Sequence, residues 1–388
     1  MSDRQVRRRS KITNFIPVNS PSFRGKEKEY LNECIDSGWI SFEGPFVERF
    51  EDEFAKHHHR TNGVSVSNGT AALELAFNAL ELKPGDEVIM PSFTIISCAR
   101  AILMTGATPV FVDVEIDSWN ASPDAIINLI SEKTKAILVV HTYGLPVNLL
   151  PLMKICEDRN IHIVEDVAEA IGLELENRLC GSFGAISTFS FYPNKHITTG
   201  EGGMILTDDK GFAEKCRLMR NLAFEGKRRF VHHHLAPNYR LTNMQAAIGL
   251  AQLENLAQTI EMKKTMGRTY LELLGGFDLI QLPLLKTSYA ENIFWVFGIL
   301  LNDVVNLDAD EMINRLKLRG IGCREFFWPI HEQPVFKNES FYSEKNDFPI
   351  SSKIARRGLY LPSGISLGKD EIDAVCRILR DILSANLK

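Results

Sequence analysis

The residues best suited to chemistry in this chain stand in FSFYPNKHITTGEGG, the stretch from Phe189 to Gly203. This stretch sets Lys195 and His196 side by side among small and hydroxyl residues. The amine of a lysine can form a Schiff base with an aldehyde and can then act as a base, whereas a histidine forms no such bond. Which of the two side chains reacts therefore decides which reaction the chain can catalyse.

A second group of polar residues lies in SNGTAAL, directly after the β-rich run at 63–67. Gly69 and Thr70 open a predicted helix there. Free backbone N–H groups at a helix N-terminus bind phosphate. A glycine turn without a ligand has the same pattern, so this segment alone does not identify a phosphate site.

Acidic residues end the predicted buried strand HIVEDV at 162–167, with Asp166 inside it and Glu169 just beyond it. A buried carboxylate is costly unless it is paired or bound to a ligand. A structural ion pair or a helix cap would account for these residues. A carboxylate that holds a protonated ring nitrogen would account for them equally well.

Lys195, Asp166 and the segment at Gly69 together are the set that pyridoxal phosphate requires. The lysine forms the Schiff base, the carboxylate keeps the pyridine nitrogen protonated, and the helix N-terminus takes the phosphate. The segments of Gly69 and Lys195 follow β-rich runs, and Asp166 lies at the end of one, where ligands of parallel α/β sheets bind. The sequence therefore predicts a pyridoxal phosphate site with Lys195 as its catalytic residue and no metal.

The elements that must position these residues form a mainly parallel sheet covered by helices. Short β-rich runs alternate with amphipathic segments between about residues 60 and 210, which is typical of an α/β fold. The predicted strands are 88–93, 109–114, 136–144, 162–167, 185–191 and 202–209, and the predicted helices include 69–80 and 149–160.

A second region follows, with a long helical stretch at 246–274, a strand at 294–301 and helices at 308–320 and 369–383. We therefore predict a large cofactor-binding domain with an N-terminal arm at 1–260 and a small α+β domain at 261–388.

Composition excludes several classes of protein. The chain has 388 residues and a net charge of -5, which argues against a general nucleic-acid binder. No apolar run reaches the ~18 residues that span a bilayer, so we expect no membrane segment. The basic run at 4–11 has no apolar stretch behind it and is not a signal peptide.

Cysteine and histidine usage adds two further expectations. The seven cysteines are scattered and show no CxxC spacing, which predicts reduced thiols in a cytoplasmic protein. The histidine triplets at 57–59 and 232–234 consist of adjacent residues that face different directions, so we expect them to bind no metal ion.

Six motifs resemble those of the DegT/DnrJ/EryC1/StrS nucleotide-sugar aminotransferases: SNGTAAL, KPGDEVIMPSFT, GATPVFVDV, VEDVAEA, FSFYPNKHITTGEGGM and NYRLTNMQAAIGLAQLE. The likeness extends from FIPVNSPSF near the start to LPSGISL near the end. It implies pyridoxal phosphate as cofactor, fold type I of the enzymes that use it (aspartate aminotransferase-like), and a homodimer with active sites between the subunits. Whether dimers pair into tetramers is left open.

The resemblance also implies roles for single residues. Lys195 falls on the family's Schiff-base lysine and Asp166 on the partner of the pyridine nitrogen. Glu169 falls near the phenolic oxygen of the cofactor. Phosphate contacts fall on Gly69, Thr70, Ser190 and, from the neighbouring subunit, Asn238. Many members stack an aromatic residue on the cofactor ring where this chain has Ile95.

The resemblance places possible substrate contacts in whole segments, and it is less specific about single residues. Trp39, Ser41 and Gly44 of WISFEGP and His331 of FFWPIH fall near the family's sugar and pyrophosphate surroundings. Arg228 and Arg229 could bind the diphosphate across the dimer interface, because arginine suits phosphate geometry. Each of these residues is equally compatible with an ordinary surface or core position.

The family also answers the question of lysine or histidine. One branch replaces the Schiff-base lysine by histidine and dehydrates its sugar. Its first histidine matches Lys195 and its second matches His196, so this chain keeps the aminotransferase lysine. The likeness at WISFEGP, EGKRRF and CREFFWPIH implies transfer from L-glutamate to C4 of a GDP-linked 4-keto-6-deoxysugar.

Two other hypotheses remain at this stage. A 4-aminotransferase for a UDP- or dTDP-linked sugar would have nearly the same sequence features. A regulatory protein could keep the fold without turnover, although the presence of both Lys195 and Asp166 argues against it.

Overall fold

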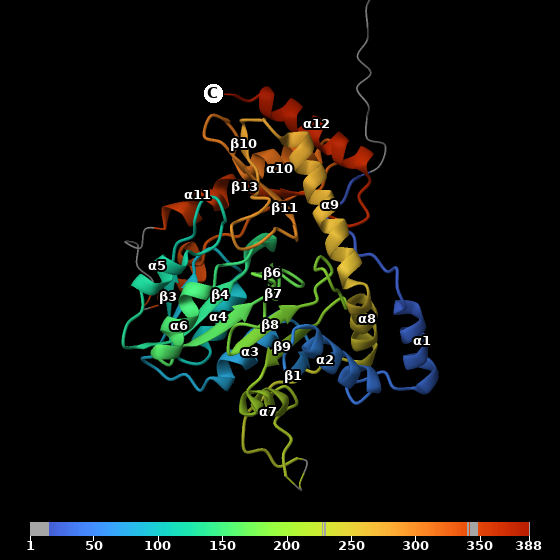
Figure 1. The fold of residues 1–388 in the computed structure, drawn as a ribbon, viewed down its shortest axis with the longest axis vertical. Helices are drawn as coiled ribbons and strands as arrows, with labels where there is room; N and C mark the ends of the chain where they lie inside the picture. The colour runs from blue at the N-terminus through green and yellow to red at the C-terminus, as the bar shows by residue number, and fades with distance from the viewer. Residues whose placement is uncertain (1–14, 227, 229, 340, 342–347, 388) are drawn as a thin grey trace, which may run out of the picture.

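The computed structural model describes residues 15–226, 228, 230–339, 341 and 348–387. A seven-stranded sheet with the order β1-β9-β8-β5-β4-β2-β3 lies at the centre of its larger part (Figure 1). Its strands are β1 (Asn62–Val66), β2 (Glu87–Pro91), β3 (Thr108–Val112), β4 (Thr134–Val140), β5 (His162–Asp166), β8 (Ile186–Ser190) and β9 (Gly203–Thr207).

Six of these strands run in one direction. The pairs β2–β3, β2–β4, β4–β5 and β5–β8 are parallel, whereas β9 is antiparallel to both β8 and β1. The expectation of a mainly parallel sheet is confirmed. As a result, the segments that follow β1, β5 and β8 leave the sheet at the same edge, because their strands share one direction.

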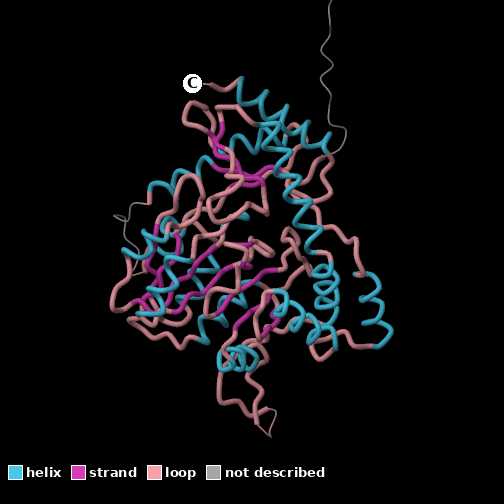
Figure 2. Tube along the Cα trace, viewed as in Figure 1, coloured by secondary structure: helices cyan, strands magenta, loops and turns pink. Residues whose placement is uncertain are grey.

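Strand alternation divides the core between the two faces of the sheet. Ile137, Val139 and Ile163 belong to the cluster that includes α2 (Pro45–His57), α6 (Leu150–Asp158) and α8 (Asn243–Glu254). Leu138 and Val164 belong to the cluster that includes α3 (Gly69–Ala79), α4 (Ile96–Leu103) and α7 (Lys210–Met219). Figure 2 shows the strands enclosed between these helices. Glu165 and Asp166 consequently point to opposite faces.

The helices around the large sheet occupy the N-terminal two-thirds of the chain. They are α1 (Glu27–Ser37), α2 (Pro45–His57), α3 (Gly69–Ala79), α4 (Ile96–Leu103), α5 (Pro123–Asn128), α6 (Leu150–Asp158), α7 (Lys210–Met219) and α8 (Asn243–Glu254). A short hairpin joins β6 (Glu174–Leu175) to β7 (Arg178–Leu179).

A four-stranded antiparallel sheet with the order β10-β11-β13-β12 forms the smaller part, at the top of Figure 1. Its strands are β10 (Ile280–Gln281), β11 (Phe297–Leu301), β12 (Arg324–Glu325) and β13 (Gly358–Leu361), and the accompanying helices are α9 (Leu256–Leu274), α10 (Ala309–Lys317), α11 (Pro349–Arg357) and α12 (Lys369–Ser384). None of the helices in the described ranges is long and apolar enough to cross a bilayer.

The predicted division near residue 260 falls inside α9, which runs without a break, and the division stays a prediction. The smaller part contains residues that precede the large sheet in the sequence as well as residues that follow it. The N–H of Ile16 donates to the carbonyl of Gly320, and Ile16 forms a parallel bridge with Ile321. The N-terminal arm thus lies against the C-terminal region.

Three predicted boundaries were wrong for local reasons. The stretch 246–274 is two helices, because Asn255 interrupts it and its side-chain amide donates to the carbonyl of Ala251 at 3.0 Å. The strand predicted at 294–301 begins only at Phe297, since Phe294 has a φ of 50°. The strand predicted at 136–144 ends at Val140, before Tyr143 with a φ of 54°.

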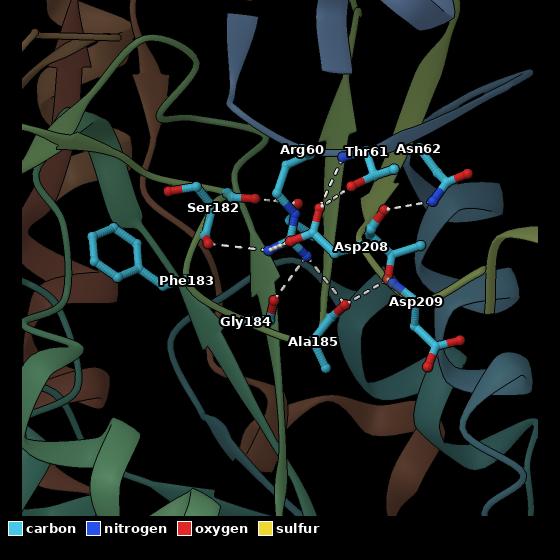
Figure 3. A network of polar contacts seen from close by, with 12 residues as sticks. Arg60, Thr61, Asn62, Ser182, Phe183, Gly184, Ala185, Asp208 and Asp209 are labelled. Carbon is cyan, nitrogen blue, oxygen red and sulfur yellow. Dashed lines mark hydrogen bonds and ion pairs between the residues drawn. The ribbon is translucent and has the colours of Figure 1, made fainter. Parts of the chain in front are cut away.

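Arg60, just before β1, binds the loop that precedes β8 (Figure 3). Its guanidinium donates to the carbonyls of Ser182, Gly184 and Ala185 at 3.0, 2.9 and 3.2 Å and pairs with Asp208 at 3.2 Å. The arginine side chain is only 5% exposed. The two terminal nitrogens of this buried cation thus donate to backbone carbonyls of the loop and hold it against the start of β1.

Candidate active site

A cavity of about 350 Å³ lies at the edge where β1, β5 and β8 end. Six of the residues predicted for the cofactor site line it: Gly69, Thr70, Asp166, Glu169, Ser190 and Lys195. They come from three separate segments of the sequence, and the parallel strand order brings them together.

Lys195 lies in the turn after β8, with its side chain 10% exposed. Its Nζ is 3.9 Å from Glu169 Oε1 and 3.8 Å from the ring centroid of Trp295. Burial lowers the pKa of Lys195, while the charges of Glu169 and Asp166 oppose that shift. Burial likewise raises the pKa of Glu169 to about 7, against the opposing effect of Lys195. A lysine in such surroundings can act as a base near neutral pH.

Asp166 ends β5 and is 4% exposed. Its Oδ1 accepts the N–H of Ala168 at 3.0 Å, and the thiol of Cys98, at 3.4 Å, is the one donor to its Oδ2 among the described residues. Burial raises the pKa of Asp166, because these contacts and the charge of Lys195 only partly compensate for the lost water. A cationic N–H placed in the cavity would supply the partner that this carboxylate lacks.

The N-terminus of α3 forms another wall of the cavity. Asn68 caps the helix by accepting the N–H of Ala71 at 2.8 Å, which leaves the N–H groups of Gly69 and Thr70 without an acceptor inside the helix. A Cβ at Gly69 would come within 2.9 Å of Ser190 Cβ, so glycine lets the two segments meet. These donors and the Ser190 hydroxyl suit a phosphate group.

The cavity therefore fits pyridoxal phosphate in three independent respects. Lys195 could bond to the aldehyde, Asp166 could hold the ring nitrogen, and the α3 N-terminus with Ser190 could hold the phosphate. Ile95, where many relatives carry an aromatic residue, also lines the cavity and is 46% exposed.

The other predicted residues lie outside this cavity. Trp39, Ser41 and Gly44 surround Asn243, which donates to the carbonyl of Trp39 at 2.6 Å. His331 Nδ1 lies 2.6 Å from the hydroxyl of Ser92. The exposed positions include Asn238 and Arg228, and Arg229 lies outside the described residues. Their roles in binding substrate or phosphate stay predictions.

His196, the neighbour of Lys195, is 2% exposed and does not line the cavity. Burial lowers its pKa well below the ordinary value, so it is a neutral side chain in the protein interior. Its position agrees with the prediction that the lysine, and not the histidine, faces the cofactor.

Sequence reasoning missed the lining residues from the C-terminal part of the chain. Trp295, Arg324, Phe327 and Tyr360 border the same cavity. Arg324 and Phe327 belong to the motif CREFFWPIH, of which only His331 was predicted as a site residue. The motif was a usable signal, but Trp295 and Tyr360 lie in apolar runs typical of core strands.

Comparison with known proteins agrees with the geometry. The aminotransferase TlmJ from Streptoalloteichus hindustanus has the same fold, with a TM-score of 0.87 and 28% identity over 95% of this chain and 99% of that chain. The protein is a pyridoxal phosphate-dependent nucleotide-sugar aminotransferase of fold type I. It belongs to the DegT/DnrJ/EryC1/StrS aminotransferase family, whose model matches residues 21–380.

Two relatives are similar to this chain over nearly their whole length. GDP-perosamine synthase from Escherichia coli O157:H7 is 40% identical over 371 residues, which cover 95% of this chain and 99% of that protein. The putative pyridoxal phosphate-dependent aminotransferase EpsN from Bacillus subtilis (strain 168) is 33% identical over 372 residues, which cover 94% of this chain and 95% of that protein.

Proposed function

We propose that this enzyme transfers the amino group of L-glutamate to C4 of GDP-4-keto-6-deoxy-D-mannose and so produces GDP-perosamine. Likeness to GDP-perosamine synthase at 40% identity over nearly the full length supports the substrate. The observation that carries the chemistry is the position of Lys195 Nζ, buried between Glu169 and Trp295 in a cavity that also contains Asp166.

When bound, pyridoxal phosphate supplies a reactive aldehyde and a ring that withdraws electrons from the carbon next to nitrogen. The chain's own residues provide the rest. Asp166 would hold a positive charge at the ring nitrogen, and the α3 N-terminus with Ser190 would hold the phosphate. Lys195 Nζ takes the proton from Cα of glutamate in one half-reaction and delivers a proton to C4 of the sugar in the other. The two substrates then react in turn, with ping-pong kinetics.

The substrate is tested by a coupled assay in which GDP-, UDP- and dTDP-linked 4-keto-6-deoxysugars compete as amino acceptors. We expect the highest kcat/KM with the GDP-linked mannose derivative. A clear preference for a UDP- or dTDP-linked sugar would show that the GDP-linked sugar is not the substrate. The proposed aminotransferase chemistry would still hold.

Absorbance separates an enzyme from a regulatory protein on the same fold. The holoprotein should be yellow, and L-glutamate alone should bleach the visible band in a single half-reaction. A protein that stays colourless after incubation with pyridoxal phosphate would contradict catalysis.

We also propose that a second copy of the chain completes the site. Asn238 is exposed and lies outside the cavity of its own chain, as expected if it reaches the phosphate of a neighbour. Mixed dimers of Lys195→Ala and Asn238→Ala chains would then contain one intact site and regain activity. If Asn238→Ala is inactive alone and mixing restores nothing, the shared site is wrong.

A further inference from the structure

Three cavities meet at Arg324. It borders the Lys195 cavity, a second cavity of about 380 Å³ and a third that contains Asn194. The other residues that line the second cavity are Tyr143, Trp295, Glu325, Phe327 and Tyr360. Arg324 lies on the edge strand β12, directly opposite Tyr360 of β13. The pairing places both side chains on the same side of the small sheet.

The charges around these cavities are unequal. Lys195 and Arg324 are the only cationic side chains that border them among the described residues. The carboxylates of Asp166, Glu169 and Glu201 line the first cavity, and that of Glu325 lines the second. Nor does any described carboxylate form an ion pair with Arg324, which is exposed to solvent. With the amine of Lys195 bonded to the cofactor, Arg324 would be the one cationic side chain left at these cavities in the part of the chain that the structure describes.

A second group in the cavity also lacks a partner. The side-chain oxygen of Asn194 is buried and accepts no hydrogen bond from any described residue, although Asn194 borders the Lys195 cavity. A buried acceptor of this kind calls for a donor from a ligand. An amino acid carries both complementary groups, an N–H donor and a carboxylate, on one carbon atom.

We propose that Arg324 binds the α-carboxylate of the amino donor, an inference that rests on the proposed aminotransferase function. The α-carboxylate is two bonds from the reacting nitrogen, so its counter-ion must border the same cavity as Lys195 Nζ. The diphosphate of a nucleotide sugar is separated from C4 by the sugar ring and extends beyond a cavity of about 350 Å³, at the small end of the usual range for ligand sites. Arginine also suits a carboxylate, because its N–H groups can bind both oxygens.

Two small amines test this binding without a complete turnover. Aminooxyacetate and O-methylhydroxylamine both react with the carbonyl of the bound cofactor, but only aminooxyacetate carries a carboxylate. The rate of loss of the visible band is measured for wild-type holoenzyme, Arg324→Met and Arg324→Lys. Arg319→Met is the control, since Arg319 is also exposed and lines none of the three cavities.

We expect wild type and Arg319→Met to prefer aminooxyacetate. Arg324→Met should lower that preference roughly 10- to 100-fold, because the charge-assisted hydrogen bonds to the carboxylate are lost. The rate with O-methylhydroxylamine should stay nearly unchanged. Arg324→Lys should fall between the two, because it keeps the charge and loses the paired donors. An unchanged preference in Arg324→Met would overturn the proposal.

The second half-reaction distinguishes the amino donor from the sugar diphosphate. Arg324→Met, converted to its amino form with excess glutamate, should keep the wild-type KM for the GDP-sugar. A loss confined to the GDP-sugar would overturn the proposal and assign Arg324 to the diphosphate. Failure of the proposed function would look different, since wild type itself would then show no visible band and react with neither amine.

Discussion

Glu165 and Asp166 are adjacent in β5 and both are buried, yet they lie in opposite electrostatic surroundings. Glu165 accepts the N–H groups of Gly181, Phe183 and Gly184 at 2.7, 2.8 and 2.6 Å, and His141 lies 3.3 Å away. Burial alone would raise the pKa of Glu165, but His141 and then the backbone N–H groups outweigh it, and the pKa lies below its ordinary value. Asp166 accepts one N–H and one thiol, and its pKa is raised.

The difference distinguishes a structural charge from a functional one. Two charges hold the loop at 181–185. Glu165 accepts its N–H groups. Arg60 donates to its carbonyls, as Figure 3 shows. On the other face, Asp166, Glu169 and Lys195 share few hydrogen bonds and border a cavity. Buried charges left incompletely satisfied by the protein are those that a ligand can complete.

The largest expected effect is at Lys195. Lys195→Ala should lower kcat roughly 10⁴-fold or more, because it removes both the covalent attachment and the base. Single-turnover bleaching by glutamate measures this. His196→Asn is the control and should keep most of the activity, since that side chain does not border the cavity. Equal losses in both variants would remove the distinction between the two residues.

Asp166→Asn should lower kcat roughly 10²-fold or more, because a neutral amide does not stabilise a protonated ring nitrogen in a low-dielectric site. Without cofactor, the variant should be no less stable than wild type, since burial disfavours the charge of Asp166. Thermal unfolding of the apoprotein and kcat together test this. A destabilised but active variant would mean that Asp166 is structural.

Glu165→Gln should show the reverse, a loss of about 2–3 kcal/mol in unfolding free energy through weaker bonds to three backbone N–H groups. Because the pKa of Glu165 is lowered in the fold, its carboxylate stabilises the protein above the unfolded pKa of about 4.3. That stability is lost as pH falls through the folded pKa. Denaturant unfolding should therefore show the full difference at pH 7 and a shrinking one in acid. A constant difference would contradict a role for the charge.

Lys263 adds a buried amine to the comparison of buried charges, and its described hydrogen-bond partners are backbone carbonyls. Its Nζ donates to the carbonyls of Trp295 and Ser363 at 2.8 and 2.5 Å, and burial, with a smaller effect of Lys195, lowers its pKa to about 7. The unfolded state then binds more protons between pH 7 and about 10.4, so wild type gains stability there as pH rises.

Relative to Lys263→Met, we expect wild-type apoprotein to gain about 2 kcal/mol between pH 7 and pH 9. Denaturant unfolding of both proteins at the two pH values gives this difference directly. A flat difference would mean that Lys263 stays charged in the interior.

Much of the site could be predicted from the sequence, because it follows from local patterns. Short apolar runs marked the strands, and polar residues after three of them identified Gly69, Asp166 and Lys195. Trp295 and Tyr360 could not be placed, because they reach the cavity only through packing of the small sheet against the large one. Glu165 and Asp166 face opposite ways by strand alternation, but which face holds the cavity depends on strand order.

The central claim is that Lys195 Nζ bonds to the cofactor, and borohydride reduction tests it most directly. Holoenzyme is reduced, digested and analysed by mass spectrometry. The account predicts the reduced cofactor on the peptide that contains FYPNKHITTGEGG, attached at Lys195, and none on Lys195→Ala. Attachment to another lysine, or no attachment to wild type, would contradict it.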